Sequence, residues 1–294
     1  MYKNLADAVR DAEARSVRLA DVALEAESRD QGRPIEDIRA ALGRALAIMR
    51  GAIQRGMVGD LMSNSGLVGG DAAKLRASSA GPIAGAPFRD VLVRALAVQE
   101  VNAAMGVIVA APTAGGAGIL PAVLTGLADA RGLSDDTVID ALATAGLIGA
   151  VVAERASLSG AEGGCQAETG AAAGMAAGAA VEMLGGTPSQ AGHATALAQQ
   201  GTLGLVCDPL GGLVELPCVF RNATGAAIAL AAIEMAMAGV TFAIPVDEVI
   251  DVMGEIGKAM DVRYRETAGG GLAATPTGRR LAKERLVQIK RADG

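Results

Sequence analysis

Three cysteines are the residues of this sequence that could most directly do chemistry. Cys165 lies in SGAEGGCQAE, Cys207 in LGLVCDPLGG and Cys218 in VELPCVFRN, so each stands in a loop-like segment of small residues. A cubane iron–sulfur cluster normally takes four cysteine ligands, and three thiolates would leave one of its irons open. An open iron is a Lewis acid that can bind a substrate oxygen. A cluster held by these three cysteines would therefore serve catalysis instead of electron transfer.

The same cysteines allow other interpretations. Free cysteine is often buried as a small hydrophobe, and the sequence contains no CxxC pair. A structural zinc site could use Cys165, His193, Cys207 and Cys218, although the usual paired spacing of zinc ligands is absent. For Cys165, the helical stretch that follows its glycine loop predicts a thiol pKa lowered by N–H groups at a helix N-terminus.

Four glycine-rich loops interrupt the sequence, at residues 63–74, 112–118, 159–168 and 207–218. Loops rich in Gly, Ser and Thr present backbone N–H groups, which suit the carboxylate or phosphate group of a small ligand. Two of the four loops carry all the cysteines. We therefore expect the loops to converge on one shared site.

Composition limits the class of protein. Hydrophobic residues make up 51% of the chain but aromatic residues only 2%, so the core must be built from Ala, Val, Leu, Ile and Met. A net charge of −6 and the lack of a basic run with interleaved aromatics argue against nucleic-acid binding. The charged N-terminal stretch lacks a secretory signal, and an odd number of cysteines fits a reducing compartment, so we expect a cytoplasmic protein.

The segment Val101–Ala128 is uncharged and long enough to span a bilayer. It contains Pro112 and Pro121 together with PTAGGAG, which would break a spanning helix and leave backbone groups unpaired in lipid. We therefore predict two buried segments joined by a loop, and no membrane association.

Apolar residues recur at helical spacing and period-2 alternation is nearly absent, which predicts an all-α fold. With neither an internal repeat nor a clear linker, residues 1–294 are expected to form one helical domain. Ser134 and Thr187 are predicted N-caps, and residues 59–87 are predicted to be an irregular loop. The expected helices are 5–27, 34–57, 88–105, 119–131, 135–157, 165–184, 188–200, 222–238, 245–260 and 277–288.

Several long motifs resemble one known family. The segments GVIVAAPTAGGAGILPAVL, SLSGAEGGCQAETG, LGLVCDPLGGLVELPC, FRNATGAA and RETAGGGLAATPTG are similar to the α chain of iron–sulfur-dependent L-serine dehydratases (L-serine ammonia-lyases). The resemblance extends from SGLVGGDAAK to the C-terminal helix. It implies a largely helical domain and a [4Fe–4S] cluster held by Cys165, Cys207 and Cys218. It also implies L-serine or a related small amino acid as substrate, and a separate β chain as partner.

The resemblance also suggests roles around the cluster. Backbone donors and hydroxyls of Ser65, Gly66 and the run Thr113, Ala114, Gly115 and Gly116 would hold the substrate carboxylate. His193, the only histidine, is a candidate base because its reference pKa is near neutral, and Glu162 and Lys74 are alternatives. We expect an oligomer, with the amphipathic first helices as a docking surface for the β chain.

Two positions depart from the family pattern. Gln200-Gly201 stands where a Lys-Asn pair is common, and Phe220 where a Lys is usual, so a β-substituted amino acid related to serine is an alternative substrate. A pyridoxal-phosphate lyase is a rival interpretation, with AGGAG as phosphate loop and Lys74 as Schiff-base lysine. Another interpretation is that the chain is a non-catalytic helical scaffold subunit.

Overall fold

The computed structural model describes the backbone of residues 2–292 and the side chains of residues 2–285. Within that range the regular structure is helical, which confirms the all-α prediction, and the one β-bridge joins Cys207 to Arg265. The α-helices are α1 (Leu5–Arg15), α2 (Leu19–Gln31), α3 (Ile35–Gly56), α4 (Asp71–Ala77), α5 (Ala86–Ala103), α6 (Ile119–Arg131), α7 (Asp135–Arg155), α8 (Gly160–Gly163), α9 (Ala171–Met183), α10 (Pro188–Gln200), α11 (Cys218–Met237), α12 (Val246–Ala259) and α13 (Pro276–Ala292).

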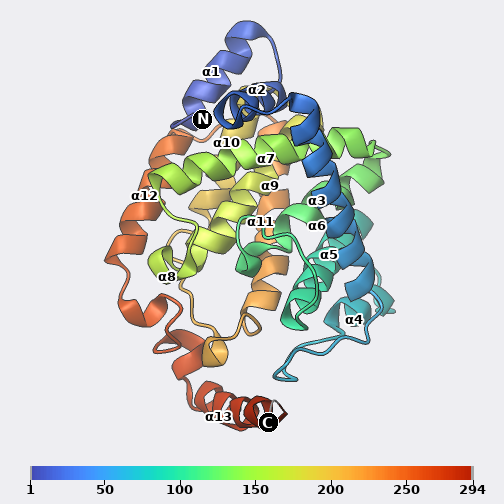
Figure 1. Cartoon of the computed structure of the whole chain (residues 1–294), viewed down its shortest axis with the longest axis vertical. Helices are drawn as coiled ribbons and strands as arrows, with labels where there is room; N and C mark the ends of the chain where they lie inside the picture. Colours follow the sequence, from blue (N-terminus) through green and yellow to red (C-terminus); the bar gives the residue numbers. More distant parts are fainter. Residues whose placement is uncertain (1, 293–294) are drawn as a thin grey trace.

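Helix α9 forms the centre of the fold and packs against α6, α7, α10 and α11 (Figure 1). Its residues are mostly alanine and glycine, and all but Glu182 are buried. A Cβ at Gly178 would lie 2.4 Å from Thr195 Oγ1, so this glycine allows α10 to approach α9 closely. A core almost free of aromatic residues is thus built by close contact between helices with small side chains.

The start and stop signals in the sequence predicted several helix bounds correctly. Helix α6 has the predicted bounds, and α7 and α10 begin at the predicted residues. The Ser134 side chain accepts a hydrogen bond from Thr137 N at 3.3 Å, and Thr187 accepts one from Gln190 N at 3.2 Å. Both predicted N-caps are confirmed.

Four predicted elements differ from the structure. The first helix is two, because Ser16 adopts a left-handed conformation at φ 53° and ends α1. The loop predicted at 59–87 contains α4, and α11 begins at Cys218, earlier than expected. The helix predicted from Cys165 starts with η2, a π-helical turn at Gln166–Gly170, before α9. π-Helical turns are frequent at functional sites.

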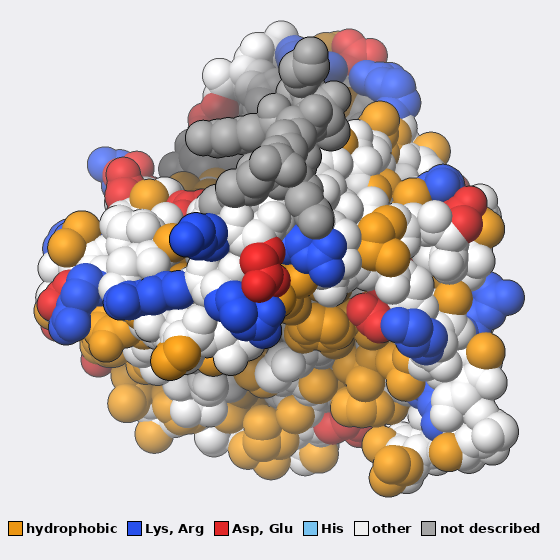
Figure 2. All heavy atoms as spheres, turned by 90° about the horizontal axis from the view of Figure 1, so that it is seen from below, with side chains coloured by type: hydrophobic (Ala, Val, Ile, Leu, Met, Phe, Trp, Pro, Cys, Tyr) orange, Lys and Arg blue, Asp and Glu red, His pale blue; other side chains and the backbone are white. Residues whose placement is uncertain are grey.

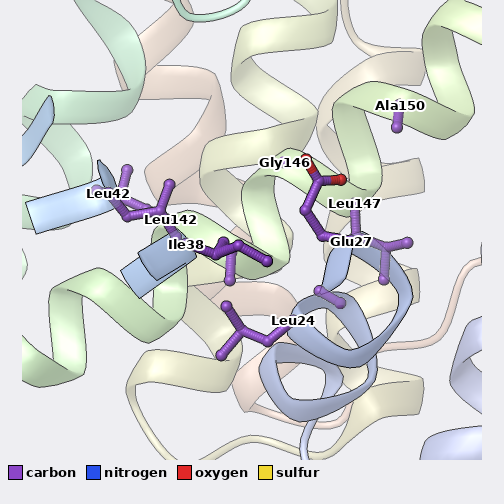
Figure 3. A pocket seen from close by; sticks show the side chains of 10 residues that line it. Leu24, Glu27, Ile38, Leu42, Leu142, Gly146, Leu147 and Ala150 are labelled. Atoms are coloured by element: carbon purple, nitrogen blue, oxygen red, sulfur yellow. The ribbon is translucent and has the colours of Figure 1, made fainter. Parts of the chain in front are cut away.

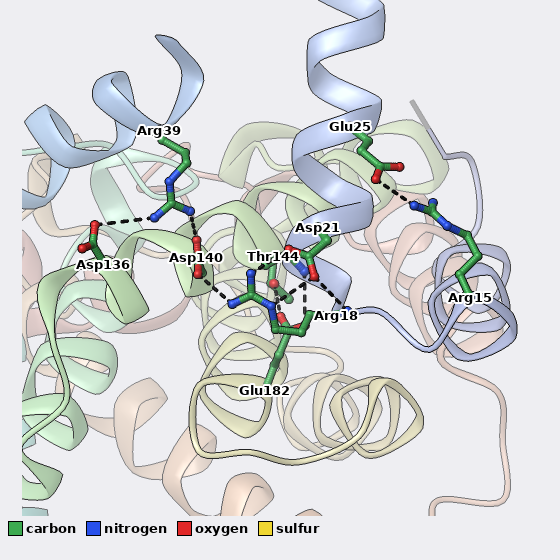
Figure 4. Close-up of polar contacts among 10 residues, drawn as sticks. Arg15, Arg18, Asp21, Glu25, Arg39, Asp136, Asp140, Thr144 and Glu182 are labelled. Atoms are coloured by element: carbon green, nitrogen blue, oxygen red, sulfur yellow. Dashed lines mark hydrogen bonds and ion pairs between the residues drawn. The ribbon is translucent and has the colours of Figure 1, made fainter. Parts of the chain in front are cut away.

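The N-terminal helices pack onto the body with their apolar faces inward. Buried residues of α1 and α2 include Leu5, Leu19 and Val22, so these faces are largely covered by the chain itself and are not the open docking surface expected. What remains open is an apolar cavity of about 320 Å³ between α2, α3 and α7, lined by Leu24, Ile38 and others (Figure 3). Ion pairs of Arg18 and Arg39 with Asp140 on α7 hold this end together (Figure 4).

Two helices, α7 and α11, are long and apolar enough to cross a membrane by length and composition alone. Neither includes the uncharged segment identified in the sequence, which the structure divides between α5, a loop and α6. Core helices of soluble proteins meet the same criterion, and α7 and α11 both pack against α9 here.

Candidate functional site

The four glycine-rich loops contact one another in the half of the molecule away from α1 and α2 (Figure 1), and the fourth loop contacts α13 through η3 (Leu210–Gly212). Ser63 Oγ donates a hydrogen bond to Glu215 Oε2 at 2.7 Å, which joins the first loop to the last. Thr113 Oγ1 donates to Glu168 Oε1 at 2.6 Å, which joins the second loop to the third. A Cβ at Gly160 would lie 3.1 Å from Cys207 Sγ, so the third and fourth loops are also in close contact. The predicted convergence of the loops is confirmed.

The three cysteines are free thiols in this convergence zone and are almost fully buried, with exposed fractions of 3%, 2% and 6% for Cys165, Cys207 and Cys218. Burial raises the pKa of all three thiols, and the charge of Cys165 raises the pKa of both others further. The pKa of Cys218 rises to about 12. The lowered pKa expected at Cys165 is therefore wrong, because desolvation outweighs the opposing effects of the Thr169 hydrogen bond and the Arg221 charge.

The Arg221 guanidinium lowers the pKa of two of these thiols, Cys165 and Cys218, and so opposes the effect of burial. Burial alone would lower the pKa of its guanidinium, but the neighbouring Cys165, Asp208 and Cys218 raise it. Arg221 Nη2 lies 2.8 Å from Asp208 Oδ1, and Nη1 donates to the Val206 carbonyl at 2.8 Å. The buried ion pair with Asp208 holds the positive charge beside the cysteines. The hydrogen bond to the Val206 carbonyl anchors the backbone before Cys207.

Glu168 is the carboxylate that the fold brings to the cysteines. It lies one helical turn after Cys165, and its Oε2 accepts a weak hydrogen bond from Cys207 Sγ at 4.0 Å. Burial raises its pKa, while the Thr113 hydrogen bond opposes that shift. A Cβ at Gly115 would lie 2.8 Å, and one at Gly160 2.7 Å, from the Glu168 carboxylate. Glycine at both positions leaves the room that this carboxylate occupies.

The carbonyls of the 3₁₀ turn η1 (Ala114–Gly116) accept hydrogen bonds from three buried or half-buried amides, those of Gln99, Asn102 and Asn222. Gln99 Nε2 donates to the Ala114 carbonyl at 2.9 Å, and Asn222 Nδ2 donates to the Gly115 carbonyl at 2.6 Å. Asn222 also donates to the Cys218 carbonyl at 2.9 Å, which ties this turn to a cysteine. Because N–H and C=O point in opposite directions across a trans peptide, the N–H groups of Gly115 and Gly116 point away from these amides.

The three free thiols are the soft donors that this site could offer to a metal centre. No group of three or more His, Cys, Asp or Glu side chains among those the structure describes is arranged to hold one ion. A cluster of four irons is wider than one ion and accepts thiolates that lie farther apart. Because burial disfavours the thiolate form of all three cysteines, bound cations would be needed to stabilise the thiolates as ligands. Thiolates are soft ligands, and iron–sulfur clusters are among the centres that they favour.

The structure does not bring His193 to the cysteines. Helices α9 and α10 run antiparallel, with Gly178 packed between Ala191 and Thr195, so His193 lies level with Gly178. At about 1.5 Å rise per residue, that point is about 20 Å along the helix from Cys165. His193 Nδ1 there accepts a hydrogen bond from Phe242 N at 3.3 Å. The four-ligand zinc site with His193 is therefore wrong.

The other two candidate bases have exposed side chains that are paired with residues other than the cysteines. Lys74 is on the exposed side of α4, where its Nζ pairs with Asp71 at 2.9 Å and its side chain is 73% exposed. The arrangement required for a pyridoxal-phosphate site, with Lys74 at the AGGAG loop, is not formed. Glu162 is exposed and accepts a hydrogen bond from Ser157 Oγ at 2.6 Å.

The predicted carboxylate-binding residues divide into two groups. Thr113 to Gly116 lie beside Glu168, as described above. Ser65 lies in the same zone, but its backbone N–H donates to Glu215 Oε1 at 3.2 Å and its hydroxyl donates to Glu215 Oε2. Gly66 N donates to the Ser63 carbonyl at 2.9 Å. In this structure Ser65 and Gly66 therefore shape the site, and their contact with substrate stays a prediction.

Sequence reasoning missed Glu168, Asp208, Glu215 and Asn222, the buried polar residues that hold the loops together. Three of these had a signal in the sequence, the first two because Glu168 follows Cys165 by one helical turn and Asp208 adjoins Cys207. Asn222 follows Cys218 by four residues, the spacing that places its side chain at the Cys218 carbonyl.

The fold and site define an all-α protein whose glycine-rich loops gather three buried thiols, a carboxylate and a fixed guanidinium. A family model described as "Serine dehydratase alpha chain" matches residues 14–273. The chain is 47% identical over 286 residues to "Probable L-serine dehydratase, alpha chain" of Bacillus subtilis, covering 97% of this chain and 95% of that protein. It is 40% identical over 274 residues to "L-serine dehydratase, alpha chain" of Peptoniphilus asaccharolyticus, covering 92% and 94%.

A longer relative contains the same region as part of one chain. "L-serine dehydratase" of Streptomyces coelicolor is 42% identical over 267 residues, which are 88% of this chain but 58% of that protein. The chain belongs to the serine dehydratase α-chain family.

Proposed function

We propose that this chain is the catalytic subunit of an L-serine dehydratase that converts L-serine to pyruvate and ammonium. The observation that carries the proposal is the burial of three free thiols in the zone where the four glycine-rich loops meet, in a chain whose relatives bear this name. The thiolates of Cys165, Cys207 and Cys218 would hold a [4Fe–4S] cluster. When bound, the cluster supplies a Lewis-acidic iron that polarises the serine hydroxyl and stabilises hydroxide as it leaves.

The chain's own residues bind and orient the substrate. The N–H groups of Gly115 and Gly116 are directed away from the amides that hold the η1 carbonyls, so they are available to bind the serine carboxylate. Gln99 and Asn222 keep this turn rigid, which reduces the entropy lost when the substrate is positioned. Loss of water from serine leaves aminoacrylate, which tautomerises and hydrolyses to pyruvate and ammonium.

Glu168 and Arg221 position the site. Glu168 holds the Thr113 hydroxyl and contacts Cys207, so it sets the separation between the η1 turn and the thiols. Arg221 stabilises negative charge on the cysteines and is kept in place by Asp208. The near-complete burial of the thiols excludes bulk water from the reacting centre.

Phe220 and Gly201 bear on the identity of the substrate. Phe220 is 43% exposed, and Gly201 lines a cavity of about 500 Å³ together with Arg221 and Thr169. Neither position supplies a cation to this cavity, so a related β-substituted amino acid is kept as the alternative to serine, which the names of the relatives favour.

The test is pyruvate formation from L-serine by the chain purified and assayed without oxygen, alone and with a family β chain. We expect pyruvate and ammonium in equal amounts, and loss of both when Cys207 is replaced by Ser. Turnover of L-threonine or L-cysteine in place of L-serine would support the alternative substrate. Folded, iron-loaded protein that yields no keto acid from any of the three would refute the proposed activity and favour a non-catalytic scaffold.

A further inference from the structure

Another cavity lies beside the turn that bears Cys165 and the segment paired with Cys207. Its volume is about 280 Å³, and its walls come from α8, η2, α12 and the segment around Arg265. Small or apolar residues form most of the lining, including Gly163, Ala167 and Gly257. Four polar side chains complete it: Ser157, Glu162, Lys258 and Arg265.

The charges around this cavity are not paired with one another. Among the described residues, neither Lys258 nor the Arg265 side chain makes an ion pair or hydrogen bond, and Glu162 contacts only Ser157. Arg265 Nε is buried without a hydrogen-bond partner. Asp261 is within electrostatic range of Arg265 but forms its ion pair with Arg263, at 3.2 Å. A buried guanidinium donor without a partner costs free energy that a bound acceptor would recover.

We propose that this cavity binds a small α-amino acid as its zwitterion. Arg265 and Lys258 would bind the carboxylate, since a guanidinium matches the geometry of that group, and Glu162 would bind the α-ammonium group. Two cations and one carboxylate around one small cavity are complementary to a zwitterion, whereas a simple anion would leave Glu162 facing a like charge. The proposal does not depend on the dehydratase chemistry.

The backbone connects this cavity to the thiols. Cys207 N donates to the Tyr264 carbonyl, and Glu266 N donates to the Cys207 carbonyl, both at 2.8 Å, so Arg265 lies in a segment paired with Cys207. Gly163 and Ala167 are each two residues from Cys165. An amino acid held between Arg265 and Glu162 would therefore stabilise two of the three cysteine segments at once.

The test is equilibrium dialysis of radiolabelled L-alanine, which cannot lose a β-hydroxyl, against the full chain with its cluster, under anaerobic conditions. Arg265→Gln and Glu162→Gln should each weaken one class of alanine site roughly tenfold to a hundredfold, the effect of losing a charged hydrogen bond. Lys258→Gln, on an exposed side chain, should weaken the same site without risk to folding. The matched controls Arg44→Gln and Glu255→Gln, at exposed positions outside the cavity, should leave alanine binding unchanged.

Competition with L-lactate and inorganic phosphate distinguishes a zwitterion site from an anion site. We expect both to displace alanine from this site poorly, because neither carries an ammonium group. Displacement by either at the concentration of alanine itself, or alanine binding unchanged in Glu162→Gln and Lys258→Gln, would overturn the proposal. Because the experiment measures alanine binding and not pyruvate formation, its result does not depend on whether the proposed dehydratase activity is correct.

Discussion

Thr113 and Glu168 form a 2.6 Å hydrogen bond that joins the turn after α5 to the helical turn that bears Cys165. The two residues are 55 positions apart, and their contact fixes the proposed carboxylate-binding turn relative to the thiols. The same carboxylate contacts Cys207 and is enclosed by Gly115 and Gly160. Glu168 thus contacts three of the four loops and fixes their positions relative to one another.

Replacing Gly115 by Ala should reduce turnover far more than stability. The new Cβ would lie 2.8 Å from both Glu168 carboxylate oxygens, which can move only by breaking the Thr113 hydrogen bond. Pyruvate formation and thermal unfolding should be measured together. Gly51→Ala in α3 is the matched control, since a Cβ there meets nothing within 4 Å and should stabilise the helix by about 0.5–1 kcal/mol. Full activity in Gly115→Ala would show that the Thr113–Glu168 contact is dispensable.

Asp208→Asn should destabilise the protein by about 3 kcal/mol, because it leaves the buried Arg221 guanidinium without its counter-charge. Asp208 Oδ2 also accepts a hydrogen bond from Leu272 N at 2.6 Å, so the segment before α13 should loosen as well. Urea unfolding gives the free energy directly. Asp60→Asn, which removes an exposed partner of Arg55, is the control and should cost less than about 1 kcal/mol. Equal losses in the two variants would contradict the structural role given to Asp208.

Glu182 should lower the free energy of unfolding as pH rises above about 4.5. Burial raises the pKa of this carboxyl above its ordinary 4.5, while hydrogen bonds from Thr144 and Ala20 N oppose the shift (Figure 4). As pH rises above 4.5, the Glu182 carboxyl loses its proton in the unfolded chain before it does so in the folded chain. Its contribution to the free energy of unfolding therefore falls as pH rises toward its folded-state pKa. Glu182→Gln should therefore gain stability relative to the wild type across that window.

The measurement is the free energy of unfolding of both proteins from pH 4 to pH 8. Exposed Glu154→Gln is the control and should show a nearly constant difference from the wild type. A Glu182→Gln difference that is also constant with pH would mean that the carboxyl is not perturbed in the folded protein.

A family β chain should raise serine turnover by the α chain. The end of the molecule next to α13 carries exposed hydrophobic side chains across much of its face (Figure 2). Exposed Met62, Met105 and Val107 lie in the loops that flank η1 and the first glycine-rich loop. Titration of the β chain into an anaerobic pyruvate assay checks this, with Met105→Glu as a variant that should weaken the response. Serine turnover by the isolated chain that a β chain cannot raise would show that the α chain suffices.

Much of the fold followed from the sequence because helical periodicity and capping residues are local signals. Ser134 and Thr187 each marked a helix start correctly. Local signals did not show the break at Ser16, which depends on α1 and α2 packing on different neighbours, or the π-helical turn after Cys165. The convergence of the loops was predicted from their composition, and the three cysteines lie where they meet.

The polar residues that hold the site were harder to predict. Glu215 binds Ser63 and Ser65 across about 150 positions, and Asn222 binds Gly115 across 107. Such long-range contacts form only when the chain folds, so the spacing of these residues in the sequence does not predict them. His193 illustrates the opposite error, because a residue type suited to catalysis lies at a position where the fold uses it as a hydrogen-bond acceptor for Phe242.

The most direct test of the account is the iron and sulfide content of the anaerobically purified protein, with its visible absorption spectrum. We expect brown protein with broad visible absorption and about four irons per chain, as a cubane cluster requires. Replacement of Cys165, Cys207 or Cys218 by Ser should remove the colour, whereas a cysteine that only packs would cost about 1–3 kcal/mol and leave the colour unchanged. Colourless protein after anaerobic reconstitution with iron and sulfide, or wild-type iron content in all three variants, would contradict the cluster and the mechanism built on it.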